Sequence, residues 1–182
     1  MIAAHWIGMF LEAQAAELGA AENTIAAYAR DLSDFDNWCT AKSFDFATLS
    51  QDDIEAYLIH CDAQGLAKST RARRLSAIRQ LYRFAFEEKL RDDNPAIRIR
   101  GPGRDRKLPG TLSEIEVDAL LDAVRHHGRN PRDKARNICL MELLYATGMR
   151  VSELVSLPVS VARGDPRMLL IRGKGGKERM VP

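Results

Sequence analysis

Apolar side chains recur at intervals of three and four residues through the first 90 residues of the chain, the spacing of one face of an α-helix. Short polar breaks divide this region into four such stretches. We therefore predict four helices that pack as a compact bundle. The expected inward stripes of the first two helices are Trp6, Ile7, Phe10, Leu11 and Leu18, and then Ile25, Tyr28, Leu32, Phe35 and Trp38.

Residues that favour helix N-termini precede the later stretches. Asn23 is the candidate N-cap of the second helix, and Ser50 is that of the third, whose first turn holds two aspartates at the favourable end of the helix dipole. The fourth helix, "STRARRLSAIRQLYRFAFEEKL", opens at Ser69 or Thr70. Its expected buried stripe is Leu75, Ile78, Tyr82 and Ala85, with Leu81 and Phe86 at the edges.

The pattern changes after this bundle. Residues 92–110, "DDNPAIRIRGPGRDRKLPG", are rich in proline, glycine and basic residues, which is typical of a linker. A helix then begins at Thr111 or Ser113. A second helix, from about Lys134 to Tyr145, ends in the apolar run "ICLMELLYA", so we expect it at the centre of a second core.

The segment "ATGMRVSELVSLP" follows directly. Gly148 can take the positive φ that ends a helix, and Arg150 then begins a short helix that Pro158 stops at Leu157. Glu153 lies three residues further on and can orient Arg150, which would give phosphate oxygens a rigid pair of donors. A surface ion pair explains the same spacing, so this motif alone assigns no function.

The stretch "IRGKGGKERMVP" reads as a β-hairpin. Two short strands flank Gly175-Gly176, which favours a two-residue primed turn. The pattern of a nucleotide-binding phosphate loop is absent from it. Lys174 lies at the turn end of the first strand, where it can reach into a groove, although most turn lysines only aid solubility.

Charge is unevenly distributed along the chain. Residues 1–64 carry a net charge of −9, residues 65–107 carry +8 and residues 108–182 carry +3. Within the basic part, Lys68, Arg71, Arg73 and Arg74 crowd the start of the fourth helix, where the helix dipole disfavours cations. A nucleic-acid phosphate at that end would offset the cost, and we prefer this reading to a solvated helix face.

Cysteine spacing and hydropathy indicate the cellular compartment. Three cysteines lie far apart with no histidine at ligand spacing, which favours a reducing compartment over a disulfide framework or a zinc site. None of the apolar runs reaches transmembrane length. We expect a cytoplasmic protein without a membrane span.

Taken in order, the basic helical region, the basic linker, "LLYATGMRVSELVSL" and "IRGKGGKERMVP" resemble the tyrosine recombinase (phage integrase) family over essentially the whole chain. Within that family the chain is similar to the Xer-type recombinases, the XerD branch more than the XerC branch. The resemblance implies a mainly α fold. An N-terminal four-helix, SAM-like DNA-binding bundle would occupy residues 1–91, a basic linker 92–110, and the first part of an α+β catalytic domain, ending in a β-hairpin, 111–182.

The resemblance also implies a chemistry. Members of the family cut one DNA strand with a tyrosine, form a 3′-phosphotyrosyl intermediate and rejoin strands through a Holliday junction, without metal or nucleotide. Arg150 would be the first catalytic arginine, Lys174 the general acid that protonates the departing 5′-oxygen, and Glu153 a supporting residue. The residues that we assign to DNA binding are Thr24, Lys68, Ser69, Thr70, Arg71, Arg73, Arg74, Arg79, Arg83, Lys177 and Arg179.

The implied partners are a double-stranded DNA recombination site and a paralogous, XerC-like subunit in a tetramer on DNA. No cofactor and no metal is expected. The implied role is chromosome dimer resolution and segregation. A phage or mobile-element integrase remains an alternative.

Other family features cannot be placed. The H-x-x-R box, the nucleophilic tyrosine and the partner-docking helix all follow the hairpin in that family, whereas here every tyrosine precedes it and no histidine follows Arg150. We therefore expect a truncated recombinase that binds DNA without catalysis. A non-catalytic DNA-binding module that borrows the N-terminal bundle as a clamp or regulator stays open as well.

Overall fold

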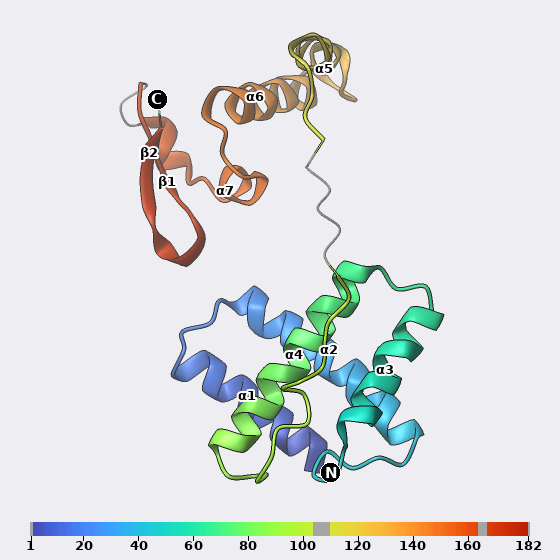
Figure 1. Ribbon diagram of the computed structural model, residues 1–182. Helices are drawn as coiled ribbons and strands as arrows, with labels where there is room; N and C mark the ends of the chain where they lie inside the picture. Colours follow the sequence, from blue (N-terminus) through green and yellow to red (C-terminus); the bar gives the residue numbers. More distant parts are fainter. Residues whose placement is uncertain (1, 104–109, 164–166, 182) are drawn as a thin grey trace. The chain divides into compact units, whose positions relative to one another are not determined.

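The computed structural model describes residues 2–103, 110–163 and 167–181. The chain forms two compact units, unit 1 (Met1–Lys107) and unit 2 (Leu108–Pro182) (Figure 1). Helices dominate both units, and the described strands form one two-stranded antiparallel hairpin. The predicted mainly α fold with a terminal hairpin is confirmed. The described helices include none long and apolar enough to cross a membrane.

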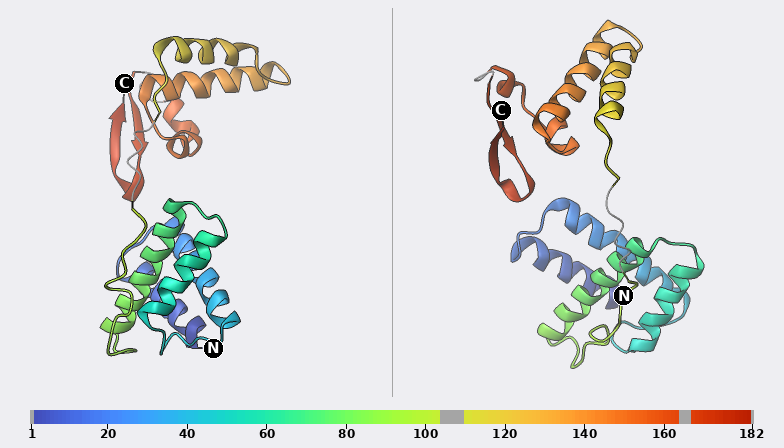
Figure 2. Two further views of the ribbon diagram at one scale, coloured as in Figure 1. Left: turned by 45° about the vertical axis from the view of Figure 1, so that its right-hand side comes forward. Right: turned by 45° about the horizontal axis from the view of Figure 1, so that its top comes forward.

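Unit 1 holds the four predicted helices, α1 (Ile2–Ala16), α2 (Glu22–Ala41), α3 (Gln51–Ala63) and α4 (Lys68–Glu87). Helix α4 packs against each of the other three (Figure 2). The predicted N-cap of α3 is confirmed. The Ser50 side chain accepts a hydrogen bond from the Asp53 backbone, and the Asp53 carboxylate accepts one from the Ser50 backbone.

The predicted starts of α2 and α4 are wrong. Helix α2 begins before Asn23, with Ala21 at the N-cap, and α4 begins at Lys68, with Ala67 at the N-cap; neither cap is made by a side chain. An alanine cannot accept a capping hydrogen bond, so these helix starts depend on packing rather than on capping.

The core of unit 1 is continuous and rich in aromatic rings. Phe35 lies at its centre, with ring centroids 4.9 Å from Tyr57 and 5.3 Å from Phe46. Two expectations fail at the margins: Leu81 is fully buried rather than at an edge, and Leu18 is exposed because α1 has already ended. The buried apolar residues of this core are Trp6, Phe10, Leu32, Phe35, Cys39, Phe46, Leu49, Ile54, Tyr57, Cys61, Leu75, Ala77, Ile78, Leu81, Tyr82, Ala85, Ala96 and Ile99.

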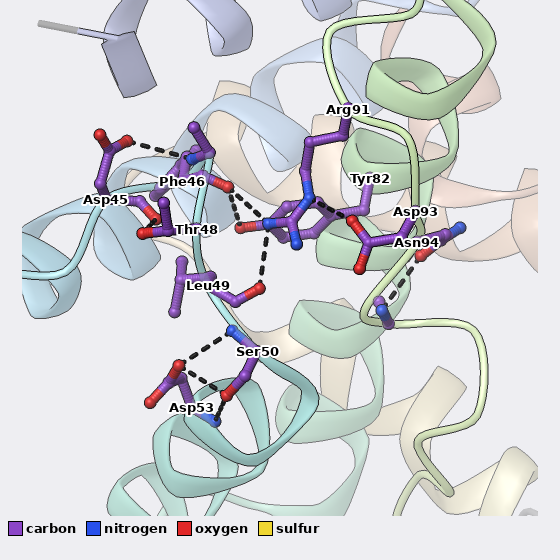
Figure 3. Close-up of polar contacts among 12 residues, drawn as sticks. Asp45, Phe46, Thr48, Leu49, Ser50, Asp53, Tyr82, Arg91, Asp93 and Asn94 are labelled. Atoms are coloured by element: carbon purple, nitrogen blue, oxygen red, sulfur yellow. Dashed lines mark hydrogen bonds and ion pairs between the residues drawn. The ribbon is translucent and has the colours of Figure 1, made fainter.

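Arg91 fastens the loop between α2 and α3 to the end of α4 (Figure 3). Its guanidinium donates hydrogen bonds to the carbonyl oxygens of Phe46 and Leu49, at 3.0 and 2.9 Å, and lies over the ring of Tyr82. A third bond runs to the carboxylate of Asp93. The Phe46 carbonyl also accepts a hydrogen bond from the Tyr82 hydroxyl at 3.3 Å. Arg91 and Tyr82 thus satisfy backbone carbonyls of this loop that would be costly to bury without partners.

The start of the predicted linker packs on unit 1. Ala96 and Ile99 are buried in its core, and the carbonyl of Ile99 accepts a hydrogen bond from Arg79 of α4. Residues 94–99 thus belong to the helical unit rather than to a solvated linker. The predicted linker residues 104–109 lie outside the described residues, and the functional division at 91 and 110 stays a prediction.

Unit 2 contains α5 (Glu114–His126), α6 (Pro131–Thr147), α7 (Val151–Val155), the 3₁₀ turn η1 (Val159–Arg163) and the strands β1 (Leu169–Arg172) and β2 (Glu178–Val181). Ser113 caps α5, as one of the two predicted starts required. Helix α6 begins three residues before the predicted Lys134, because Asn130 caps it and Pro131 stands in its first turn.

The core of unit 2 is small. Met149, Leu154, Ile171 and Val181 are buried, and Leu140, Leu143 and Leu144 of α6 are partly buried against them. The prediction that α6 lies at the centre of a second core is therefore wrong for this unit, since none of its residues is fully buried. Helix α5 likewise buries none of its residues.

Candidate functional site

The end of α6 places Arg150. Gly148 adopts φ 59° and ψ 23°, the left-handed conformation predicted for it, and its amide donates to the carbonyl of Leu144. Met149 then turns into the small core, and Arg150 takes an extended conformation at the N-cap of α7. The reversal between two helices thus sets the arginine backbone, as the sequence predicted.

Glu153 holds Arg150 from one turn further along α7. Its carboxylate accepts a hydrogen bond from the Arg150 amide at 2.8 Å and another from the Arg150 guanidinium at 2.9 Å. Glu153 has only 4% of its side chain exposed, whereas Arg150 has 68% exposed. The predicted orienting contact is present, and it leaves most of the guanidinium facing solvent.

A second arginine reaches the same carboxylate from the hairpin. Arg179 of β2 donates from both terminal nitrogens to the two oxygens of Glu153, at 3.0 and 2.8 Å. Hydrogen bonds from Arg179, then from the Arg150 amide, lower the pKa of Glu153 to about 2. The structure thus joins two of the predicted site residues, Arg150 and Arg179, through Glu153.

The hairpin differs from the predicted two-residue turn. Strands β1 and β2 pair from Leu169 with Val181 to Arg172 with Glu178, and the amide of Gly173 then donates to the carbonyl of Lys177. The loop is the turn η2 (Lys174–Gly176), one residue longer than predicted. Both of its glycines have positive φ values, which accounts for the pair of glycines. Lys174 begins this loop, and its role as an acid stays a prediction.

The basic start of α4 meets acidic side chains of its own unit. Arg71 pairs with Asp62 at 2.7 Å, Arg74 with Asp34 at 2.5 Å, and Arg73 with Asp31. Tyr57 completes one of these contacts, because its hydroxyl donates to Asp34 and accepts from Arg74. Carboxylates therefore offset the charge cost for which we invoked a phosphate.

These aspartates are the residues that the sequence analysis missed. A signal was available: Asp31 and Asp34 lie three residues apart, on one face of α2, within the segment of net charge −9. We treated the charge of residues 65–107 as a sign of an external partner. Part of it instead complements the preceding acidic segment, which a comparison of the two segments could have suggested.

The other residues assigned to DNA binding lie in varied settings. Arg79 is bound to the Ile99 carbonyl, while Arg83 forms an exposed ion pair with Glu87 on the next turn of α4. Ser69 and Lys177 are exposed, and Lys68, at the first residue of α4, is exposed too. Thr24 and Thr70 are half-buried near the starts of α2 and α4. Their exposure and internal contacts do not decide whether these residues contact DNA, so the assignment stays a prediction.

The chain matches two family profiles. The profile of the phage integrase N-terminal SAM-like domain matches residues 7–89, and that of the phage integrase family matches residues 111–182. The XerD tyrosine recombinase of Bradyrhizobium diazoefficiens is 45% identical over 96% of this chain and 57% of its own length. That of Rhizobium meliloti is 45% identical over the whole chain and 60% of its own length. The chain thus spans little more than half the length of these relatives.

Solved structures agree at the level of the fold. A lambda integrase tetramer bound to a Holliday junction aligns with a TM-score of 0.75 at 17% identity, over 98% of this chain and 49% of that one. The XerH recombinase bound to its difH substrate aligns with a TM-score of 0.69 at 21% identity, over 97% and 62% of the two chains. With both profiles matched across most of its length, this chain belongs to the phage integrase family of tyrosine recombinases.

Proposed function

We propose that this chain is part of a XerD-like site-specific recombinase, which cuts and rejoins DNA through a 3′-phosphotyrosyl intermediate and acts in chromosome dimer resolution and segregation. The observation that carries the proposal is Arg150, fixed by a buried Glu153 yet largely exposed to solvent. It lies within a chain that is 45% identical to XerD recombinases over nearly its whole length.

Arg150 is suited to stabilise a phosphate in the transition state. A guanidinium held on one side by a carboxylate loses less freedom on binding and still offers donors on its other side. Such preorganised donors contribute about 10²–10³ in rate when they meet developing charge. Lys174, in the hairpin loop, would then protonate the departing 5′-oxygen as a general acid.

Unit 1 would hold the duplex, with the start of α4 and nearby residues contacting the phosphate backbone. Lys68, Ser69 and Thr70 lie at that start, and Thr24 lies near the start of α2. Arg71, Arg73 and Arg74 remain candidates for DNA contact through donors that their aspartates leave available. Arg79, Arg83 and Lys177 would add backbone contacts, and the resulting affinity would depend strongly on salt.

We further propose that the 182-residue chain binds DNA without cutting it. Every tyrosine precedes the hairpin and no histidine follows Arg150, so the nucleophile and the second arginine motif of the family have no counterpart here. The apolar side chains that unit 2 leaves exposed, among them Ile115, Tyr145 and Val155, support a catalytic domain that contains further residues. The complete recombinase would carry this chain together with that nucleophile.

The partners proposed for the complete recombinase are a double-stranded recombination site and a paralogous, XerC-like subunit within a tetramer. The lambda integrase tetramer on a Holliday junction supports such an assembly through its shared fold. A recombinase that acts on bacterial chromosomes works in the cytoplasm, where we place the protein.

Two measurements test the function. In the complete recombinase, Arg150→Ala should slow covalent attachment to a cognate DNA site by about 10²-fold or more. Arg125→Ala is the matched control, because Arg125 lies on α5 and forms an exposed ion pair with Asp122 one turn away on the same helix. Unchanged cleavage in Arg150→Ala would refute the role of Arg150.

The second measurement uses the 182-residue chain. It should bind duplex DNA with an affinity that falls steeply as salt rises, and it should form no covalent adduct. An affinity that does not change with salt concentration, or no binding at low salt, would count against the DNA-binding role of unit 1.

A further inference from the structure

Arg179 connects the hairpin to α7 through the carboxylate that holds Arg150. Each oxygen of Glu153 accepts two hydrogen bonds, one from Arg150 and one from Arg179. Arg179 uses both of its terminal nitrogens in this contact, whereas Arg150 uses one guanidinium nitrogen and its backbone amide. Arg150 therefore keeps more of its guanidinium available to bind a phosphate than Arg179 does, although both side chains carry the same charge.

The hairpin loop also approaches this carboxylate. A Cβ placed on Gly173 would lie 3.1 Å from Oε1 of Glu153, so the backbone at that position passes close to the buried oxygen. The amide of Gly173 is bound to the carbonyl of Lys177 across the loop. Lys174 is the next residue along the chain, and its backbone is therefore anchored beside Glu153.

We propose that Arg179 is a positioning residue of the recombination site and not a DNA contact: by sharing Glu153 with Arg150, it fixes the Lys174 loop relative to Arg150. This inference rests on the proposed function. It replaces the DNA-binding role that the sequence suggested for Arg179.

Packing explains why the hairpin needs such an anchor. Only Ile171 and Val181 of the two strands are buried, and they meet a core that otherwise contains Met149 and Leu154. A pair of parallel hydrogen bonds from one guanidinium to one carboxylate adds directional restraint that apolar contacts lack. Moving Arg179 to a phosphate would leave the buried Glu153 with Arg150 as its one remaining cation among these contacts, and would draw Arg150 inward.

The first test uses the 182-residue chain and a spectroscopic reporter. The Arg150 amide donates to Glu153, so its NMR shift follows the ionisation of that carboxyl group. Arg179→Met should raise the pKa of Glu153 from about 2 toward its ordinary value of 4.5, because the largest cause of its lowering is removed. Arg179→Lys keeps the charge without the paired geometry and should give an intermediate value.

Arg172→Met is the matched control. Arg172 lies on the same hairpin, carries the same charge and pairs with Glu178 at 2.7 Å on the exposed face. Its loss should leave the Arg150 amide titration unchanged. An Arg179→Met titration that moves no further than that of Arg172→Met would overturn the proposal.

DNA binding by the same variants separates positioning from contact. A lost phosphate contact lowers the slope of log affinity against log salt by about 1. We expect Arg179→Met to keep the wild-type slope, and a fall of that size would overturn the proposal. If the wild-type chain binds no DNA, the proposed function fails, whereas the amide titration still decides whether Arg179 positions Arg150.

Catalysis by the complete recombinase gives the last readout. At saturating DNA, Arg179→Met should slow cleavage by about 10-fold or more with unchanged affinity, because misplacing a general acid forfeits part of a 10²–10⁴-fold effect. A substrate with sulfur in place of the departing 5′-oxygen needs no proton from Lys174 and should restore most of the rate. No restoration would refute the link between Arg179 and the Lys174 loop.

Discussion

The two units of this chain stabilise their helices in different ways. In unit 1, eighteen buried side chains among the described residues form one core, which α4 shares with the three other helices. In the described part of unit 2, four apolar side chains are buried, and helices α5 and α6 bury none of their residues. Helix capping is nevertheless similar in both units, since α3 and α5 begin with the same kind of capping box. Good local signals therefore do not by themselves indicate a self-sufficient core.

Separating the units gives the largest expected effect. Residues 1–107 alone should unfold in one cooperative thermal transition, because their described residues form one core of eighteen buried side chains with ten more packed against it. Residues 108–182 alone should unfold at a lower temperature and over a broader range, because their core is small. A sharp transition in the second fragment would show that its small core suffices and would remove the contrast.

The next largest effect comes from truncating one core residue. Phe35→Ala removes a ring that contacts Trp38, Phe46 and Tyr57, and should destabilise unit 1 by about 3–5 kcal/mol in denaturant unfolding. Phe86→Ala is the control, because half of that side chain is already exposed on α4. Equal losses for the two would mean that the aromatic core contributes little.

The internal ion pairs of unit 1 give an asymmetric prediction. Arg73→Met leaves the carboxylate of Asp31, which is 4% exposed, without this partner, and should cost about 3–5 kcal/mol. Asp31→Asn should cost less, about 1 kcal/mol, because water reaches the half-exposed Arg73. Chemical unfolding of both variants measures the difference.

DNA titrations of the same variants sharpen the result. If Arg73 contacts phosphate as its main role, Arg73→Met should lower DNA affinity while leaving the unfolding free energy almost unchanged. From the ion pair with Asp31 we expect the opposite: Arg73→Met should lower the unfolding free energy more than it lowers the free energy of DNA binding.

Sequence periodicity was sufficient for much of the fold. The stripes of Leu32, Phe35, Leu75 and Ile78 are buried as predicted, because a 3.6-residue repeat forces such positions onto one helix face. The starts of α2 and α4 could not be predicted from capping residues, since alanines precede them. Their limits depend on tertiary packing, which a local pattern does not contain.

The candidate site was predictable only in part. The contact between Arg150 and Glu153 follows from a three-residue spacing at a helix start, which sequence shows directly. Arg179 lies 26 residues from Glu153, and the length of the intervening hairpin loop decides whether the two meet. Likewise, the pairing of Arg73 with Asp31 spans 42 residues, so charge runs could be noted without their partners being known.

The smallest predicted effect compares the two capping boxes. Ser50→Ala should lower the stability of unit 1 by about 1 kcal/mol without melting α3, because Ile54, Tyr57 and Cys61 still anchor that helix in the core. Ser113→Ala removes the same device from α5, which buries none of its residues, and should fray its first turns. Amide hydrogen exchange along each helix measures the difference.

Acid should mimic both substitutions. Hydrogen bonds from Ser50 lower the pKa of Asp53 below 3.8, and those from Ser113 lower the pKa of Glu116 below 4.5. A depressed pKa in the folded state means that each cap stabilises its helix fully above the ordinary value, and that the contribution is lost as pH falls through the lowered one. The exchange protection factors of α5, which are the intrinsic rate at each pH divided by the observed rate, should therefore fall over this acidic range in the wild-type chain but not in Ser113→Ala. The protection factors of α3 should stay high. Equal acid sensitivity of the two helices would show that α5 has an anchor beyond its cap.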